Sequence, residues 1–203
     1  QAEKITKEVV FTDSEATLYG KELHLAAEEY IRDGKPVDPR FGFILPWLEK
    51  LDAIPGDKHC ELKLGVKKVD GRLCACDFFD SSVWFRGVAD LVIIDGDRAW
   101  IVDYKTSKSA KYADTRQLAL MAAALFLRYP QIKKIKTMLL FVVCKEYRKE
   151  DFDADFGLSI FAELNGLLEA REAAYNNDVW NPRPNGLCRQ WCDVLSCPHN
   201  GKN

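Results

Sequence analysis

The stretch WIVDYKTSK at residues 100–108 places two charged side chains two positions apart in an otherwise apolar run. Because side chains alternate between the two faces of a strand, Asp103 and Lys105 share one face. A salt bridge on a solvated edge is one interpretation of such a pair. The apolar surroundings and the charged loop that follows favour a different one, a ligand site at the edge of an α/β sheet.

A third charge is expected beside this pair. The sequence Asp-Gly-Asp at residues 95–97 is typical of a tight turn between two strands, and we expect Asp95 to pair with Arg98 across it. Counting outward from that pair places Asp90 directly opposite Asp103, with Cβ atoms about 4.5–5.5 Å apart. Two carboxylates so close repel each other unless a positive charge lies between them. Such a pair of carboxylates can bind Mg²⁺ or Mn²⁺. A divalent cation bound beside a lysine can promote hydrolysis of a phosphodiester bond.

Hydrophobic periodicity predicts the elements that must position these residues. Helices are expected from a capping box of Thr12 and Glu15 to about residue 33, and then at residues 41–54, 115–130 and about 156–175. Strands are expected at residues 59–68, 72–79, 83–95, 98–105 and 135–145. The helix before the last, almost wholly apolar strand indicates a parallel crossover. The order predicts one α/β domain over residues 1–203, with a central mixed sheet flanked by helices and a cysteine-rich tail at 186–203.

Alternation in the first strand predicts which of its side chains are buried. Cys60, Leu62 and Leu64 fall on one face, and Glu61 falls on the other. Glu61 is therefore expected to lie away from the apolar side of its strand.

Composition limits the class of protein. With 47% hydrophobic and 30% charged residues, the chain is typical of a soluble globular protein, and no apolar run approaches the roughly 18–20 residues of a membrane span. The net charge of −2 lacks the basic excess that often marks a nucleic-acid binder. It does not exclude a nuclease, because carboxylates that bind metal can offset basic residues elsewhere. The chain begins at Gln1 without a recognisable leader, so we expect a cytoplasmic protein with further residues before Gln1.

Four motifs, in this order, resemble those of the RecB-like nucleases of the PD-(D/E)XK superfamily, which also contains lambda exonuclease. They are GKELH at 20–24, GVAD at 87–90, DYK at 103–105 and QLALM at 117–121. The resemblance implies a restriction-endonuclease-like core and a metal-dependent DNA exonuclease without sequence specificity, of the phage or prophage type.

The resemblance implies a metal-ligand set. Asp90 and Asp103 would hold Mg²⁺ or Mn²⁺ together with the backbone carbonyl of Tyr104. His24, four residues after Gly20 and one helical turn away, would be a further ligand that favours Mn²⁺ in some members. The alternative for His24 is a boundary residue of its helix. The resemblance also implies an additional acidic residue of the site at Glu61, and the alternative there is a solvated strand glutamate.

The resemblance also assigns a catalytic lysine, Lys105. Gln117 would orient that lysine or the DNA backbone, or would merely cap or pack. The family's Q-x-x-x-Y motif has Met121 at its tyrosine position here, which puts a tyrosine-dependent DNA contact in doubt.

The tail spaces Cys188, Cys192 and Cys197 as C-x3-C-x4-C, followed by His199. Many RecB-like nucleases hold a [4Fe–4S] cluster with three C-terminal cysteines and one N-terminal cysteine. The first residues of this chain contain no cysteine, so the fourth ligand is absent, precedes Gln1, or is His199 in a Cys3His zinc site. An unmetallated tail remains the alternative.

Basic residues near the predicted site suit a DNA backbone: Arg86, Lys108, Lys111 and Arg116. The expected substrate is DNA, as double-stranded ends or single strands, in recombination, replication or repair. The expected partner is a single-strand-annealing or recombination protein. Two alternatives remain open. One is a structure-selective endonuclease resembling a junction resolvase, and the other is a non-catalytic, nuclease-like DNA-binding module.

Overall fold

The structure is a computed structural model, and it describes residues 13–111, 113–157 and 159–202. The chain divides into two compact units, Thr17–Glu163 and a second unit that contains Leu164–Asn203. Thr12 of the predicted capping box lies outside the described residues. No helix in the described part of the chain is long and apolar enough to cross a membrane.

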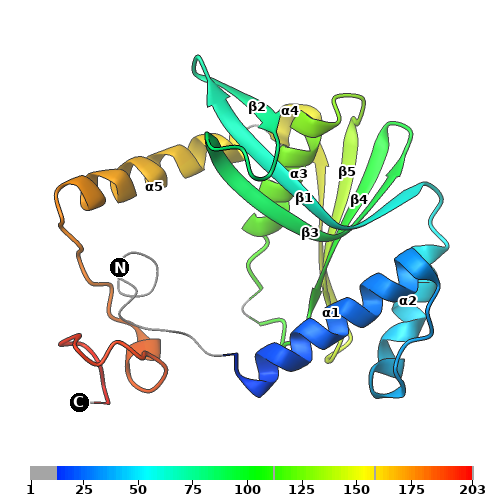
Figure 1. Ribbon diagram of the computed structural model, residues 1–203, viewed down its shortest axis with the longest axis horizontal. Helices are drawn as coiled ribbons and strands as arrows, with labels where there is room; N and C mark the ends of the chain where they lie inside the picture. The colour runs from blue at the N-terminus through cyan, green and yellow to red at the C-terminus, as the bar shows by residue number, and fades with distance from the viewer. Residues whose placement is uncertain (1–12, 112, 158, 203) are drawn as a thin grey trace. The chain divides into compact units, whose positions relative to one another are not determined.

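A six-stranded sheet forms the centre of the larger unit, in the order β2-β1-β3-β4-β5-β6 (Figure 1). The strands are β1 (Asp57–Val69), β2 (Arg72–Cys76), β3 (Val83–Asp95), β4 (Arg98–Lys105), β5 (Lys134–Phe141) and β6 (Glu146–Asp153). Only β4 and β5 are parallel, and they are connected through α3 (Arg116–Arg128). The predicted mixed sheet with one helical crossover is confirmed.

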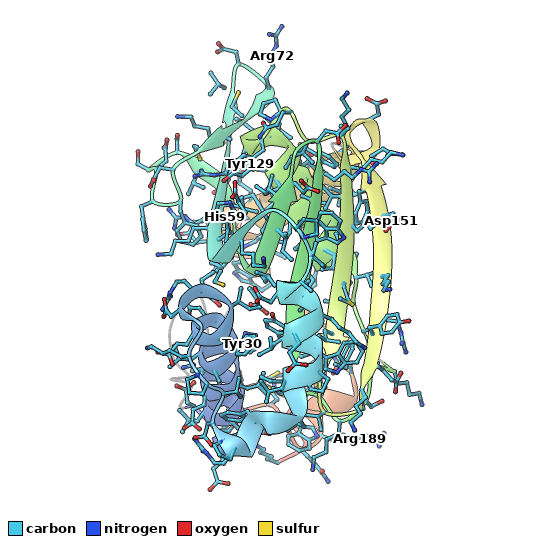
Figure 2. The ribbon with its side chains drawn as sticks, turned by 90° about the vertical axis from the view of Figure 1, so that its right-hand side faces the viewer. Tyr30, His59, Arg72, Tyr129, Asp151 and Arg189 are labelled. Atoms are coloured by element: carbon cyan, nitrogen blue, oxygen red, sulfur yellow. The ribbon has the colours of Figure 1, made fainter. Side chains whose placement is uncertain are left out.

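The two ends of the sheet differ in how well the sequence predicts them. Arg72 lies at the tip of the β1–β2 hairpin, and Asp151 lies on edge strand β6 (Figure 2). Periodicity does not predict β6, because its sequence EYRKEDFD is mostly charged and buries only Phe152. As an edge strand it pairs with β5 through backbone groups and needs few apolar side chains, while its charges protect the open edge.

Helices cover both faces of the sheet (Figure 1). On one face, called here the α1 face, lie α1 (Glu15–Asp33), the 3-10 helix η1 (Pro39–Ile44) and α2 (Leu45–Asp52). Leu23, Ala27 and Ile31 form one apolar stripe of α1 and pack in a core with strand residues that include Leu91 and Val102. The opposite face, called the α3 face, is covered by α3, whose Met121 lies against Gly87 of β3.

The predicted alternation of β1 is wrong at one position. The side chain of Cys60 lies on the α1 face, where its thiol is 3.9 Å from the Glu28 carbonyl oxygen of α1. Leu64 pairs with Gly87 and therefore faces the α3 face, although it is four residues from Cys60. The reversal occurs at Glu61, whose φ of 51° lies in the left-handed region that non-glycine residues rarely adopt.

Strand β3 reverses its faces at the same level. Leu91 and Ile93 pack in the α1-face core, whereas Gly87 faces α3. Cys60 pairs with Leu91 and Leu62 pairs with Ala89, so Asp90 lies across from Glu61 between these two pairs. We call this pair of positions, Glu61 and Asp90, the facing switch. Because of the switch, both acidic side chains emerge on the α1 face.

The smaller unit contains most of α5 (Ser159–Asn176), close to the predicted helix, and a short 3-10 helix η2 (Gly186–Cys188). The buried Asn200 organises its last residues. The side-chain amide of Asn200 donates hydrogen bonds to the carbonyl oxygens of Cys192 and Val194.

Gly65 provides a test of the packing beside the facing switch. A Cβ there would lie 2.8 Å from the Asp77 carbonyl oxygen and 2.9 Å from the Cys76 carbonyl oxygen, and backbone atoms cannot move aside cheaply. We expect Gly65→Ala to lower the free energy of unfolding by about 1–3 kcal/mol. Gly42→Ala is the control, because a Cβ there meets nothing within 4 Å. Urea denaturation measures both, and equal stability of the two variants would contradict this packing.

Candidate active site

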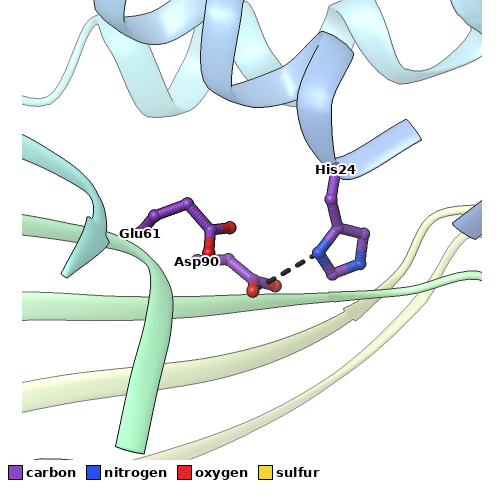
Figure 3. Close-up of side chains that lie close together, drawn as sticks. All are labelled: His24, Glu61 and Asp90. Carbon is purple, nitrogen blue, oxygen red and sulfur yellow. Dashed lines mark ion pairs between the residues drawn. The ribbon is translucent and has the colours of Figure 1, made fainter. Parts of the chain in front are cut away.

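Three potential metal ligands from three elements converge at the facing switch. His24 comes from α1, Glu61 from β1 and Asp90 from β3 (Figure 3). One ligand atom of each lies within 4.8 Å of the others. His24 Nδ1 is 3.3 Å from Asp90 Oδ1. Among the described residues, no other group of three histidine, cysteine or acidic side chains comes together in this way.

Asp90 also ties β3 to β4. The β3–β4 ladder has the predicted register, with Asp95 paired to Arg98, but it ends at Leu91 and Val102. Asp90 and Asp103 would form the next pair and do not. Instead the backbone N–H of Tyr104 donates a 2.7 Å hydrogen bond to Asp90 Oδ2. The carboxylate of Asp90 is thereby fixed between the two strands.

The imidazole of His24 lies against Asp90 and Tyr104. Burial lowers its pKa, but the hydrogen bond to Asp90 and the charges of Asp90 and Asp103 raise it, as does a hydrogen bond with the Tyr104 backbone. The net result is a pKa above the usual 6.5. The His24 ring also meets the Tyr104 ring edge to face, with centroids 5.9 Å apart. His24 therefore occupies a position where a cation, either a proton or a metal ion, is stabilised by acidic neighbours.

The acidic side chains destabilise one another as anions. Burial first, and then the charge of Asp90, raises the pKa of Glu61 and also the pKa of Asp103. For Asp103 the nearby Lys105 only partly offsets this effect. Mutual repulsion of this kind is relieved when a cation binds among the carboxylates.

Asp103 and Lys105 form the second half of the site. Lys105 Nζ lies 2.6 Å from Asp103 Oδ2 and 3.4 Å from Gln117 Oε1 of α3. The predicted proximity of Lys105 to Gln117 is therefore present in the structure. Asp103 Oδ2 is buried and is paired with the Lys105 ammonium group.

These observations fit a divalent cation of the Mg²⁺ or Mn²⁺ type. The donor set combines carboxylate oxygens with one imidazole, which suits Mn²⁺ and tolerates Mg²⁺. Asp103, whose Oδ2 is paired with Lys105, would be a further oxygen donor for such an ion. The residues that would hold it are His24, Glu61 and Asp90, with Asp103 and the Tyr104 carbonyl as the additional predicted ligands.

A cleft of about 480 Å³ opens over this group. One wall is α1, with Gly20, Lys21 and Leu25, and the other is the sheet, with Val88 beside the two switch residues. A Cβ on Gly20 would lie 3.4 Å from Thr106 Oγ1, so the glycine lets α1 approach the end of β4 closely. Gly20 and His24 lie one helical turn apart on α1. Gly20 allows the close approach to Thr106, and His24 reaches Glu61 and Asp90.

The predicted basic residues are distributed on both faces. Lys108 lines a hollow of about 440 Å³ together with Lys105 and Gln117. Arg86 lies on the α1 face, across from Gly65. Arg116 is held by Asp114, with Nη2 2.6 Å from Oδ2, and Lys111 is exposed on the same loop.

Met121 has a packing role in place of the family tyrosine. A Cβ on Gly87 would come within 2.5 Å of the Met121 sulfur, so the thioether lies directly over the glycine. The glycine of GVAD and the methionine of QLALM are therefore a matched pair in the α3-face core.

The C-terminal cysteines do not form an assembled ligand group with His199 in the described part of the chain. Cys188 and Cys192 are anchored through their backbone carbonyl oxygens, which accept hydrogen bonds from the Gly201 N–H and the Asn200 amide. A cluster or zinc ion held by Cys188, Cys192, Cys197 and His199 stays a prediction.

The structure combines a restriction-endonuclease-like core with an acidic candidate metal site beside a lysine. The family model of the PD-(D/E)XK nuclease superfamily matches residues 17–198, most of the chain, and the protein belongs to this superfamily. Membership indicates a nuclease that acts on DNA with Mg²⁺ or Mn²⁺. The chain is also similar to the crystal structure of SSO0001, with 16% identity, a TM-score of 0.38 and coverage of 98% of this chain and 94% of that one. A search of curated proteins found no match.

Glu61 is a site residue whose role periodicity leaves open. Alternation correctly places it opposite Leu64, but the left-handed φ at Glu61 also puts Cys60 on the face of Glu61, with the Glu61 carboxylate near His24 (Figure 3). Extending the β1–β3 pairing would have indicated its position across from Asp90, but that pairing is not evident from the sequence alone.

Removal of one charge at the facing switch tests the metal group. We expect Glu61→Gln to weaken Mn²⁺ binding, measured by isothermal titration calorimetry, by at least about tenfold, since loss of a ligand should cost no less than loss of a supporting residue. Glu49→Gln removes the same charge from an exposed position on α2 and should bind Mn²⁺ like the wild type. Equal affinities for all three proteins would exclude Glu61 as a ligand.

Proposed function

We propose that the protein is a metal-dependent deoxyribonuclease of the RecB-like kind, an exonuclease that acts without sequence specificity in recombination, replication or repair. The observation that carries the proposal is the convergence of His24, Glu61 and Asp90 within 4.8 Å, beside the Asp103–Lys105 pair. Membership in the nuclease superfamily and the order of the four motifs support it.

The chemistry expected of this site is hydrolysis of a phosphodiester bond. When bound, a divalent cation supplies polarisation of the phosphate and a hydroxide ion near neutral pH. Lys105 places an ammonium group where negative charge develops on the phosphate or where the attacking water is oriented. Gln117 and Asp103 hold that ammonium group in position from two sides.

Two features position the catalytic groups before substrate binds. The Tyr104 N–H fixes the Asp90 carboxylate, and Gly20 allows α1 to bring His24 over it. Preorganised groups of this kind need little rearrangement during the reaction. Lys108, beside Lys105, is placed to contact a neighbouring phosphate, a contact that carries no base information.

The activity test compares linear duplex DNA with covalently closed circular DNA in the presence of Mn²⁺. An exonuclease releases nucleotides from the linear substrate and leaves the circle intact. We expect Lys105→Ala to lower the rate about 10²–10³-fold, as expected for loss of a group that stabilises developing charge. Lys133→Ala, an exposed lysine with a 77% accessible side chain, should retain full activity.

Other outcomes would change the assignment. Cleavage of the closed circle would replace the exonuclease by a structure-selective endonuclease that uses the same residues. If the wild type and Lys105→Ala are equally inert with both Mg²⁺ and Mn²⁺, the proposal of catalysis fails, and a DNA-binding module without turnover takes its place.

A further inference from the structure

A cluster of aromatic and basic side chains lies on the sheet next to the cleft. Phe79 exposes 70% of its surface, an unusual position for a large apolar ring. The Lys63 ammonium lies 5.3 Å from the centroid of this ring, and Phe78 meets it edge to face at 5.1 Å. The Arg86 guanidinium lies 5.7 Å from the Phe78 centroid. We call Lys63, Phe78, Phe79 and Arg86 the aromatic–basic patch.

The loop that carries Phe79 is held by its own polar side chains. Asp77 accepts a 2.8 Å hydrogen bond from the Phe79 N–H. Asp80 accepts hydrogen bonds from the Ser82 backbone and hydroxyl groups, and it pairs with Lys67 at 2.9 Å. These contacts hold the pKa of Asp80 well below its usual range. The exposed ring is therefore displayed on a fixed loop.

The patch shares the α1 face with the metal-ligand group. Lys63 pairs with Val88, which lines the cleft with His24, and Arg86 pairs with Gly65 one step further along the same face. A two-residue step along a strand is about 6.6–6.8 Å. Lys63 thus lies one step from Glu61, and Arg86 lies two steps from Asp90, so the patch continues the surface of the cleft.

We propose that the aromatic–basic patch binds unpaired nucleotides of the DNA strand adjacent to the phosphate at the metal site, with Phe79 stacked on a base. This inference rests on the proposed function and names its substrate class: DNA with a single-stranded end. The faces of bases inside a duplex are covered by their neighbours, so only an unpaired or terminal base can stack on an exposed ring.

Charge favours a nucleic acid as the occupant of the patch. Lys63 and Arg86 are both exposed and flank the rings, and positive groups beside stacking aromatic rings are the combination that single-strand binders use. Their order along the strands also matches a chain of phosphates leaving the metal site, since each basic residue is one further step from the facing switch.

Fluorescence anisotropy without added divalent cation tests the inference, because binding is then measured in the absence of cleavage. The probes are a labelled oligothymidine of about 12 nucleotides, within the usual range of single-strand sites, and a blunt duplex of the same length. We expect Phe79→Ala to weaken binding of the single strand at least about fivefold, and Phe79→Trp to restore it. Lys63→Ala should weaken binding and reduce the dependence on salt by about one phosphate contact.

Tyr147→Ala is the matched control, since it removes another exposed aromatic ring, on the opposite edge strand. Because Phe79 is mostly solvated, its variants should keep the wild-type melting temperature, which verifies folding. Single-strand affinity of Phe79→Ala equal to that of the wild type would overturn the inference. So would an equal loss of affinity for the blunt duplex, because Phe79 would then not distinguish unpaired nucleotides.

The outcome is separable from the nuclease assay. Binding of the single strand that depends on Phe79, in a protein inert with Mn²⁺, supports the patch and removes the proposed catalysis. Nucleotide release by the wild type, with unchanged single-strand binding by Phe79→Ala, supports catalysis and removes the patch.

Discussion

Repulsion between carboxylates is the interaction on which the site depends. Glu61, Asp90 and Asp103 lie in a partly buried region where burial and mutual charge raise the pKa of Glu61 and Asp103. The protein offsets this only in part, through Lys105 beside Asp103 and the Tyr104 N–H at Asp90. What remains is a local excess of negative potential beside an imidazole, and a divalent cation bound there would relieve it.

The arrangement depends on a break in the regular alternation of side chains between the two faces of the sheet, at Glu61 of β1 and Asp90 of β3. A left-handed φ at Glu61 costs about 1–2 kcal/mol in a non-glycine residue. In return, Cys60 and Glu61 both face α1, as do Asp90 and Leu91, so acids and core residues emerge side by side. Beyond the switch the same strands turn Lys63 and Arg86 toward the cleft side. One local irregularity therefore determines both the metal-ligand group and the surface beside it.

The sequence predicted those parts of the fold that depend on local patterns. The bounds of β3 and β4 and the pairing of Asp95 with Arg98 follow from a turn signal and two apolar runs, and the crossover follows from an apolar strand after an Ala- and Leu-rich helix. Strand β6 and the reversal of faces between Cys60 and Leu64 could not be predicted in this way. The first depends on pairing with β5, and the second on a left-handed backbone torsion at Glu61 that hydrophobic periodicity does not reveal.

Diffraction from crystals soaked in Mn²⁺, with the anomalous scattering of manganese locating the ion, tests the central claim most directly. The account predicts a manganese peak in contact with His24, Glu61 and Asp90 on the α1 face, at the facing switch. Crystals that take up Mn²⁺ elsewhere while showing no ion in contact with Asp90 would contradict it.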